Sequence, residues 1–299
     1  MTVLDRCYVD AGADEVAIGR NVMLATARPP STPPAHTETG GHMSTYAFNN
    51  DWHRARQRLA FLEQSLDAGT FRRVRALGIA DRWQCLEIGA GGGSVARWLC
   101  SQVGASGRVV AIDIDTRFLD GLHESNLEVR RHNLISDSLP QNSFDLVHTR
   151  MVLMHIPSRE EILPRLVSAL KPGGWLVIEE ADIYPVLATA SGSYRQVWEA
   201  FGRSMVREAG VAPEWARQLP QLLARQGLQV GAAEGEITIF PGTSAMAEFW
   251  SLTWTQVRER ILAAGVDENI LEDVLRMLSD PTEWFTGPAI IAAWGRRPS

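Results

Sequence analysis

The sequence predicts an α/β fold built on a doubly wound, mostly parallel sheet. Short apolar runs alternate with amphipathic stretches between residues 83 and 182, and crossovers of this length join parallel strands. The first apolar run, at 83–88, leads directly into a glycine-rich turn at 89–94 (GAGGGS) and then a helical stretch. Because such a turn exposes backbone N–H groups and the positive end of a helix, it predicts a nucleoside-binding site.

Two stretches precede the first strand. Residues 1–45 have weak periodicity and a proline-rich run, PPSTPP at 29–34, which predicts a poorly ordered N-terminal extension. Residues 46–80 carry apolar side chains at three- and four-residue steps, which predicts two helices separated at Gly69, with Thr70 capping the second. We expect these helices to form a lid over the site, within a single domain at 46–299.

Five strands are predicted in the cofactor-binding core at 81–182, at residues 83–88, 108–113, 126–132, 144–149 and 175–180. The helix after the glycine turn should end near residue 103, and Thr116 should cap a short helix. A capping box at 158–161 (SREE) predicts a helix that continues to residue 170. The sequence KPGG at 171–174 then predicts a tight return into the fifth strand.

The regular alternation ends after residue 182. Helical patterns occupy 191–208, 212–226, 244–264 and 267–279, with a strand near 228–240 and a last strand within 286–299. The segment 183–285 is longer than crossovers require. We therefore expect insertions that form a helical cap over the carboxyl ends of the strands.

Composition excludes several classes of protein. A formal net charge of −6 argues against a nucleic-acid partner, which usually needs a basic face. The three cysteines show no CxxC spacing, which fits a reducing compartment and predicts no metal site. No apolar run approaches the length of a membrane span, and the acidic N-terminus lacks the apolar core of a signal peptide. We expect a cytoplasmic protein without a membrane partner.

Polar side chains stand at the ends of the first three predicted strands, at Glu87, Asp113 and Asn133. Ligands of open α/β sheets bind at these carboxyl ends, and a carboxylate at Asp113 suits the two hydroxyls of a ribose. Glu87 precedes the first glycine, where it would repel a pyrophosphate and attract a cation. S-adenosylmethionine has an ammonium, a sulfonium and no phosphate, and therefore fits better than a dinucleotide. The dinucleotide-binding motif GxGxxG/A is also matched only in part, because Ser94 occupies its last position.

Four ordered motifs then resemble those of the class I S-adenosylmethionine-dependent methyltransferases. They are ExGxGxG at 87–93, the acid at Asp113, SFDLV at 143–147 and LKPGG at 170–174. The similarity covers residues 70–182 and is greatest to members that modify small molecules, including bacterial secondary metabolites. It implies a seven-stranded sheet whose last strand is antiparallel, S-adenosylmethionine as cofactor, and a small-molecule methyl acceptor.

The resemblance also implies roles for residues around the glycine turn. Glu87 would lie near the methionine amino group of the cofactor. Asp113 would hold the ribose hydroxyls, and Ile114 would pack on the adenine. The turn residues expected against the methionine and ribose parts are Gly89, Ala90 and Gly91.

Two further strand ends complete this implied cofactor site. Asn133 and Leu134 stand at the adenine amino group, where many members have Asp followed by a small or apolar residue. Thr149 and Arg150 match positions that line the methionine end. The resemblance implies no metal ligand.

His155 and Asp182 are the candidate catalytic residues. His155 follows the fourth strand and would act as a base if the acceptor is a hydroxyl, although a histidine can also simply structure this turn. Asp182 would orient an amine or hydroxyl, or else cap a helix. His148 lies inside a strand, so we expect it to be buried.

The insertions concentrate aromatic residues that would suit a flat or apolar acceptor, the insertions' own core, or a homodimer interface. Two other functions remain open. One is an NAD(P)-dependent oxidoreductase, which Glu87 and Ser94 disfavour. The other is a methyltransferase-like protein that binds the cofactor without transferring methyl, as a cyclase or in a structural role.

Overall fold

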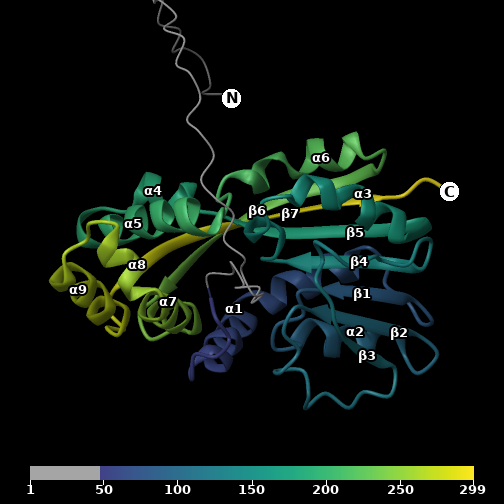
Figure 1. Cartoon of the computed structure of the whole chain (residues 1–299), viewed down its shortest axis with the longest axis horizontal. Coiled ribbons are helices and arrows are strands. Elements are labelled where there is room, and N and C mark those ends of the chain that lie inside the picture. The colour runs from purple at the N-terminus through teal and green to yellow at the C-terminus, as the bar shows by residue number, and fades with distance from the viewer. Residues whose placement is uncertain (1–47) are drawn as a thin grey trace, which may run out of the picture. The chain divides into compact units, whose positions relative to one another are not determined.

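A seven-stranded sheet runs through residues 48–299, the part of the chain that this computed structural model describes (Figure 1). The predicted extension at 1–45 lies outside the described residues. The spatial order is β3-β2-β1-β4-β5-β7-β6. The strands are β1 (Gln84–Ile88), β2 (Arg108–Asp113), β3 (Leu127–Arg131), β4 (Phe144–Arg150), β5 (Leu170–Asp182), β6 (Gln229–Pro241) and β7 (Trp284–Arg296).

Strand directions confirm the predicted fold class. β1 pairs in parallel with both β2 and β4, and β4 pairs in parallel with β5. β7 is antiparallel to β5 on one side and to β6 on the other. The strand order reverses between β1 and β4, which is where open α/β sheets bind their ligands.

Helices cover both faces of the sheet, because apolar strand side chains point to both faces and must be buried on each. On one face, Leu99 of α2 (Ser94–Val103) and Val74 of α1 (Ala55–Ala76) are buried with Cys85. On the other face, Leu163 of α3 (Arg159–Ala169) and Leu223 of α6 (Leu219–Arg225) are buried with neighbouring strand residues such as Leu86. Because successive side chains of β1 enter different clusters, this strand is buried on both faces.

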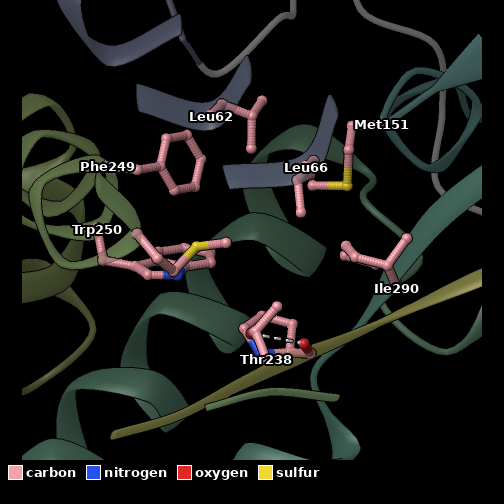
Figure 2. Close-up of a pocket in the computed structure, with 10 residues that line it drawn as sticks. Leu62, Leu66, Met151, Thr238, Phe249, Trp250 and Ile290 are labelled. Carbon is pink, nitrogen blue, oxygen red and sulfur yellow. Dashed lines mark hydrogen bonds between the residues drawn. The ribbon is translucent and has the colours of Figure 1, made fainter. Parts of the chain in front are cut away.

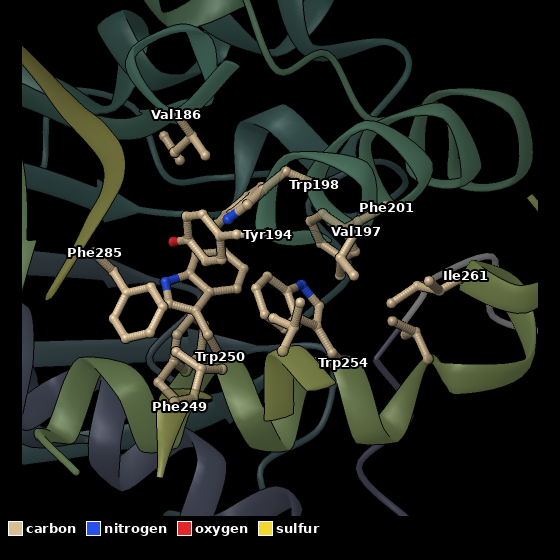
Figure 3. Close-up of a cluster of buried hydrophobic side chains, with 14 of the residues drawn as sticks. Val186, Tyr194, Val197, Trp198, Phe201, Phe249, Trp250, Trp254, Ile261 and Phe285 are labelled. Atoms are coloured by element: carbon tan, nitrogen blue, oxygen red, sulfur yellow. The ribbon is translucent and has the colours of Figure 1, made fainter. Parts of the chain in front are cut away.

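The remaining helices form a lobe beside β6 and β7 (Figure 1). They are α4 (Tyr184–Thr189), α5 (Gly192–Ala209), α7 (Ala245–Gln256), α8 (Arg258–Ala263) and α9 (Glu268–Leu278). Figure 3 shows their aromatic core, in which Trp198 and Trp250 approach edge-on with ring centroids 4.4 Å apart. Trp254 and Tyr194 are buried in the same cluster. Most of the aromatic residues in the insertions therefore serve the lobe's own core.

The caps predicted at Thr70, Thr116 and Ser158 were wrong. Residues 55–76 form one helix, α1, because the buried Thr70 hydroxyl donates to Glu179 (3.1 Å) instead of capping a new helix. Thr116 starts only isolated turns, since Leu119 N donates to Thr116 O without a following helical ladder. Ser158 precedes α3 as predicted, but its side chain makes no capping hydrogen bond.

The fifth strand begins at Leu170, earlier than predicted. The KPGG segment belongs to β5 and pairs with residues after β7: Gly173 N donates to Arg297 O (2.9 Å), and Arg297 N donates to Gly174 O (2.8 Å). Among residues 48–299, no helix is both long and apolar enough to cross a bilayer. Across the same residues, no group of three or more His, Cys, Asp or Glu side chains is arranged to hold a metal ion.

Candidate functional site

The glycine turn lies between the carboxyl ends of β1 and β2. Gly89 and Gly91 have positive φ angles of 67° and 56°, which side chains rarely adopt. Gly89 N and Ala90 N donate to Ile112 O (2.8 and 3.2 Å), so the first part of the turn is fixed to β2. Gly91 N donates to Asp113 Oδ2 at 3.0 Å. The turn and the predicted ribose-binding acid are therefore directly connected.

Asp113 ends β2 with both carboxylate oxygens hydrogen-bonded. Asp115 N donates to Oδ1 at 3.0 Å, and Gly91 N to Oδ2. Burial raises the pKa of this carboxyl above its usual range, while the backbone N–H groups oppose that rise. Ile114 next to it is 46% exposed, which leaves an apolar surface for a ligand beside the carboxylate.

In the loop after β3, the Asn133 side chain is hydrogen-bonded within the loop, whereas the Leu134 side chain is buried in the core. Asn133 Oδ1 accepts from Ile135 N at 3.0 Å, so its carbonyl oxygen already has one donor. The Leu134 side chain is buried in the core beneath α3. Ile135 is 55% exposed and is the apolar side chain that this loop presents to solvent.

Glu87 lies buried beneath the glycine turn and contacts His148. Its Oε2 is 2.6 Å from His148 Nδ1, and the other ring nitrogen lies 3.4 Å from Glu179 Oε1. Burial disfavours the charged imidazole, but the two carboxylates outweigh it and raise the pKa of His148 to about 9. Burial raises the pKa of Glu87 as well, and the charge of His148 opposes that rise. His148 is fully buried, as expected.

Thr149 and Arg150 lie at the end of β4, and neither presents a free polar group to solvent. Thr149 is buried, and its hydroxyl has no hydrogen-bond partner among the described residues. Arg150 donates to Thr70 Oγ1 and Asp67 Oδ1 of α1, both at 2.9 Å. These contacts fix the end of β4 to α1.

Sequence reasoning missed the polar face of α1. Asp67 Oδ1 accepts from Ser94 Oγ at 3.1 Å, and Glu63 Oε1 accepts from Ser94 N at 3.3 Å, at the start of α2. Burial raises the pKa of Glu63, whose carboxylate lies beside Gly92. Residues 63, 67 and 70 are spaced by four and three, which places their polar side chains on one face of a helix. This spacing could have predicted the polar face.

The two candidate catalytic residues lie in different surroundings. His155 ends a short turn, η1 (Leu153–His155), where burial and the nearby Arg58 and Arg159 lower its pKa to about 4. Asp182 is buried and accepts from Tyr184 N (2.8 Å) and from both Arg217 Nε and Nη2. The structure thus gives Asp182 an ion pair with Arg217 and a hydrogen bond from the first residue of α4, and the catalytic roles of both residues stay predictions.

Glu180 of β5 is another residue that sequence reasoning missed. Its side chain is fully buried, and its Oε1 accepts from Val152 N (3.2 Å) and Leu153 N (2.7 Å) in the loop after β4. Burial raises the pKa of Glu180 to about 8. The available sequence signal was a pair of adjacent glutamates, Glu179 and Glu180, directly after an apolar run of strand residues.

A small apolar cavity lies between α1, α7 and the ends of β4 to β7 (Figure 2). Its accessible volume is about 10 Å³. In Figure 2, Leu62 and Leu66 of α1 face Phe249 and Trp250 of α7 across it. The other lining residues are Met151, Ala181, Thr238, Met246, Pro288 and Ile290.

The structure thus groups the predicted cofactor residues around one turn, with α1 between that turn and the apolar cavity. Glu87, Gly89, Ala90, Gly91 and Asp113 lie at the turn or directly beneath it. Their assignment to a cofactor stays a prediction.

Comparisons with known proteins agree with this arrangement. Residues 40–232 match the family model described as a methyltransferase domain. The chain is 33% identical over 162 residues to Methyltransferase str2 of Strobilurus tenacellus, covering 52% of this chain and 58% of that protein. It is 22% identical over 195 residues to trans-aconitate 2-methyltransferase of Rhodococcus jostii (strain RHA1), covering 63% and 70%.

The matched regions span 58% and 35% of the first two curated relatives, so those matches leave much of each relative uncovered. Among solved structures, the YcgJ protein of Bacillus subtilis is 14% identical with a TM-score of 0.52, covering 76% of this chain and 97% of its own. At that identity the likeness concerns the fold alone. The family match shows that the chain belongs to the methyltransferase domain family, and the likeness in fold agrees with it.

Proposed function

We propose that the protein transfers a methyl group from S-adenosylmethionine to an oxygen or nitrogen of a small apolar or aromatic metabolite. One relationship carries the proposal: Gly91 N donates a hydrogen bond to Asp113, next to the point between β1 and β4 where the strand order reverses. The bound cofactor supplies a methyl group already activated on a sulfonium sulfur. The remaining chemistry is binding, alignment and proton removal by the protein's own residues.

The residues near the turn fit a cationic cofactor without phosphate. Asp113 would accept from the ribose hydroxyls, and the exposed Ile114 would pack on the adenine. Glu63 and Asp67 add carboxylates from α1 at the start of α2, where a pyrophosphate would meet negative charge. This charge pattern favours S-adenosylmethionine over NAD(P).

The acceptor site is the apolar cavity between α1 and α7. Its lining is almost wholly apolar, which suits a flat or apolar metabolite. An accessible volume of about 10 Å³ is close to that of one water molecule, so α1 and α7 must move apart to admit an acceptor. The relative named for trans-aconitate supports a small-molecule acceptor. We place the reaction in cytoplasmic secondary metabolism.

His155 is the proposed proton acceptor when the methylated group is a hydroxyl. With its pKa lowered to about 4, the imidazole is neutral at physiological pH and has a lone pair to accept the proton. It is then a weak base, which an already activated methyl group tolerates. An amine acceptor would lose its proton to solvent without this residue.

Calorimetry and a transfer assay test the proposal together. We expect binding of S-adenosylhomocysteine and no binding of NADH, followed by labelled-methyl incorporation into a panel of small apolar acceptors read by mass spectrometry. Tight NADH binding without S-adenosylhomocysteine binding would establish the oxidoreductase alternative instead.

A variant of the cavity separates transfer from binding. Ala181→Leu adds side-chain volume to the cavity lining, so we expect methyl transfer to fall while S-adenosylhomocysteine affinity is retained. Cofactor binding with no transfer to any metabolite fraction would favour the cyclase or structural alternative.

A further inference from the structure

The loop after β4 contacts both parts of the proposed active site. Met151 lines the apolar cavity. Val152, the next residue, lies against the glycine turn so closely that a Cβ on Gly89 would come 2.2 Å from Val152 Cγ2. A displacement of these two residues would therefore alter the acceptor cavity and the cofactor turn at the same time.

This loop has a strained backbone that its neighbours must maintain. Met151 has a φ of +59°, in the left-handed region that residues other than glycine rarely occupy. Its N–H donates to Glu179 O at 2.8 Å, which continues the pairing with β5. The next two N–H groups, of Val152 and Leu153, both donate to the Glu180 carboxyl.

We propose that Glu180 is a positioning residue that fixes the loop after β4, so that Val152 packs against the cofactor turn while Met151 forms a wall of the acceptor cavity. The inference rests on the proposed function. It assigns Glu180 no contact with either substrate, because its side chain is fully buried and acts through the two loop N–H groups.

The surroundings of Glu180 support an accepting role over a charged one. Burial raises its pKa to about 8, so the carboxyl is mostly protonated at neutral pH. Its Oε2 has no hydrogen-bond partner among the described residues, and its Oε1 accepts from both loop N–H groups. On the opposite side of the loop, Arg159 Nε donates to Leu153 O at 3.1 Å. The loop is thus held through both its N–H and C=O groups.

Three variants separate positioning from general stability. Glu180→Gln keeps a carbonyl oxygen where Oε1 accepts both N–H groups, and Glu180→Ala removes it. Val109→Ala is the matched control, because Val109 is fully buried but lies at the amino-terminal end of β2, away from the loop. Amide hydrogen exchange of the protein without added cofactor, over residues 151–156, reports on the loop directly.

We expect Glu180→Ala to speed exchange in this loop and to weaken S-adenosylhomocysteine binding by about tenfold, the scale of one lost hydrogen bond. The KM for an acceptor should rise as well. Glu180→Gln should match the parent in both measurements, and Val109→Ala should lower the unfolding temperature without changing either. If Glu180→Ala does not fold, Glu180→Asp, which draws the carboxyl back by one methylene, should give the same changes.

Unchanged exchange or unchanged affinity in Glu180→Ala would overturn the inference, as would a Glu180→Gln variant as defective as Glu180→Ala. Failure of the proposed function has a different signature. In that case the parent protein itself would bind no S-adenosylhomocysteine, while loop exchange would still respond to Glu180.

Discussion

The Glu87 carboxylate and the His148 imidazole lie 2.6 Å apart, both buried beneath the glycine turn. Glu179 lies on the other side of the ring, and Arg73 pairs with Glu179 at 2.8 Å. Glu87 is therefore the first member of a buried chain of alternating charges that reaches α1. Its charge toward a ligand depends on whether His148 is protonated.

Removing the His148 ring should strongly destabilise the fold. His148→Ala leaves Glu87 buried without its nearest counter-charge, and breaking a buried pair in this way costs about 3–5 kcal/mol. Urea denaturation measures the change in the free energy of unfolding. Thr149→Val, at the next position of β4, is the control and should have little effect because its buried hydroxyl has no partner. Equal losses in the two variants would refute the pairing.

The stability of the protein should fall as pH rises through the weakly alkaline range. The pKa of His148 is raised from 6.5 to about 9 on folding, so the folded state binds this proton more tightly than the unfolded state. Its stabilising contribution is complete below pH 6.5 and is lost as pH rises toward 9. Glu180, with a pKa raised to about 8, acts in the same direction. Denaturation series at pH 6 and 9 should show the fall, and His148→Gln should reduce it.

Gly89→Ala should damage the cofactor turn in two ways. The added Cβ would lie 2.2 Å from Val152 Cγ2, and the φ of 67° disfavours any side chain. We expect a loss of more than about 1 kcal/mol in stability and weaker S-adenosylhomocysteine binding by calorimetry. Adding Val152→Ala should recover only part of both losses, because it relieves the contact but not the backbone angle. Full recovery would show that the backbone angle is unimportant.

Asp113→Ala should weaken cofactor binding by about 1–3 kcal/mol, the scale of losing a buried polar partner. Part of this loss comes from Gly91 N, which would no longer have its acceptor. Calorimetry with S-adenosylhomocysteine gives the affinity directly. Asp115→Ala is the comparison, since Asp115 contacts Arg117 and Asn50 rather than the turn. An unchanged affinity in Asp113→Ala would remove this residue from the site.

Regular segments were predictable because their information is local. The strand Arg108–Asp113 matches its predicted bounds, and the helix after the glycine turn ends at Val103 as expected. The helix break predicted at Gly69 and Thr70 was wrong, because a contact with a residue distant in the sequence outweighed the local preference for a turn. Thr70 is buried against Glu179, more than a hundred residues away, and that contact keeps α1 continuous.

By itself, the sequence determined the α/β class, the glycine turn, the strand-end acid Asp113 and the family. Each of these depends on residue types at fixed short spacings, which set backbone angles and strand ends. Only the tertiary structure decided that His148 accompanies Glu87, that Arg217 engages Asp182, and that Glu180 holds the loop after β4. These are contacts between residues 27 to 61 positions apart. Burial brings such groups together and shifts their pKa values, and no local pattern encodes which pairs will meet.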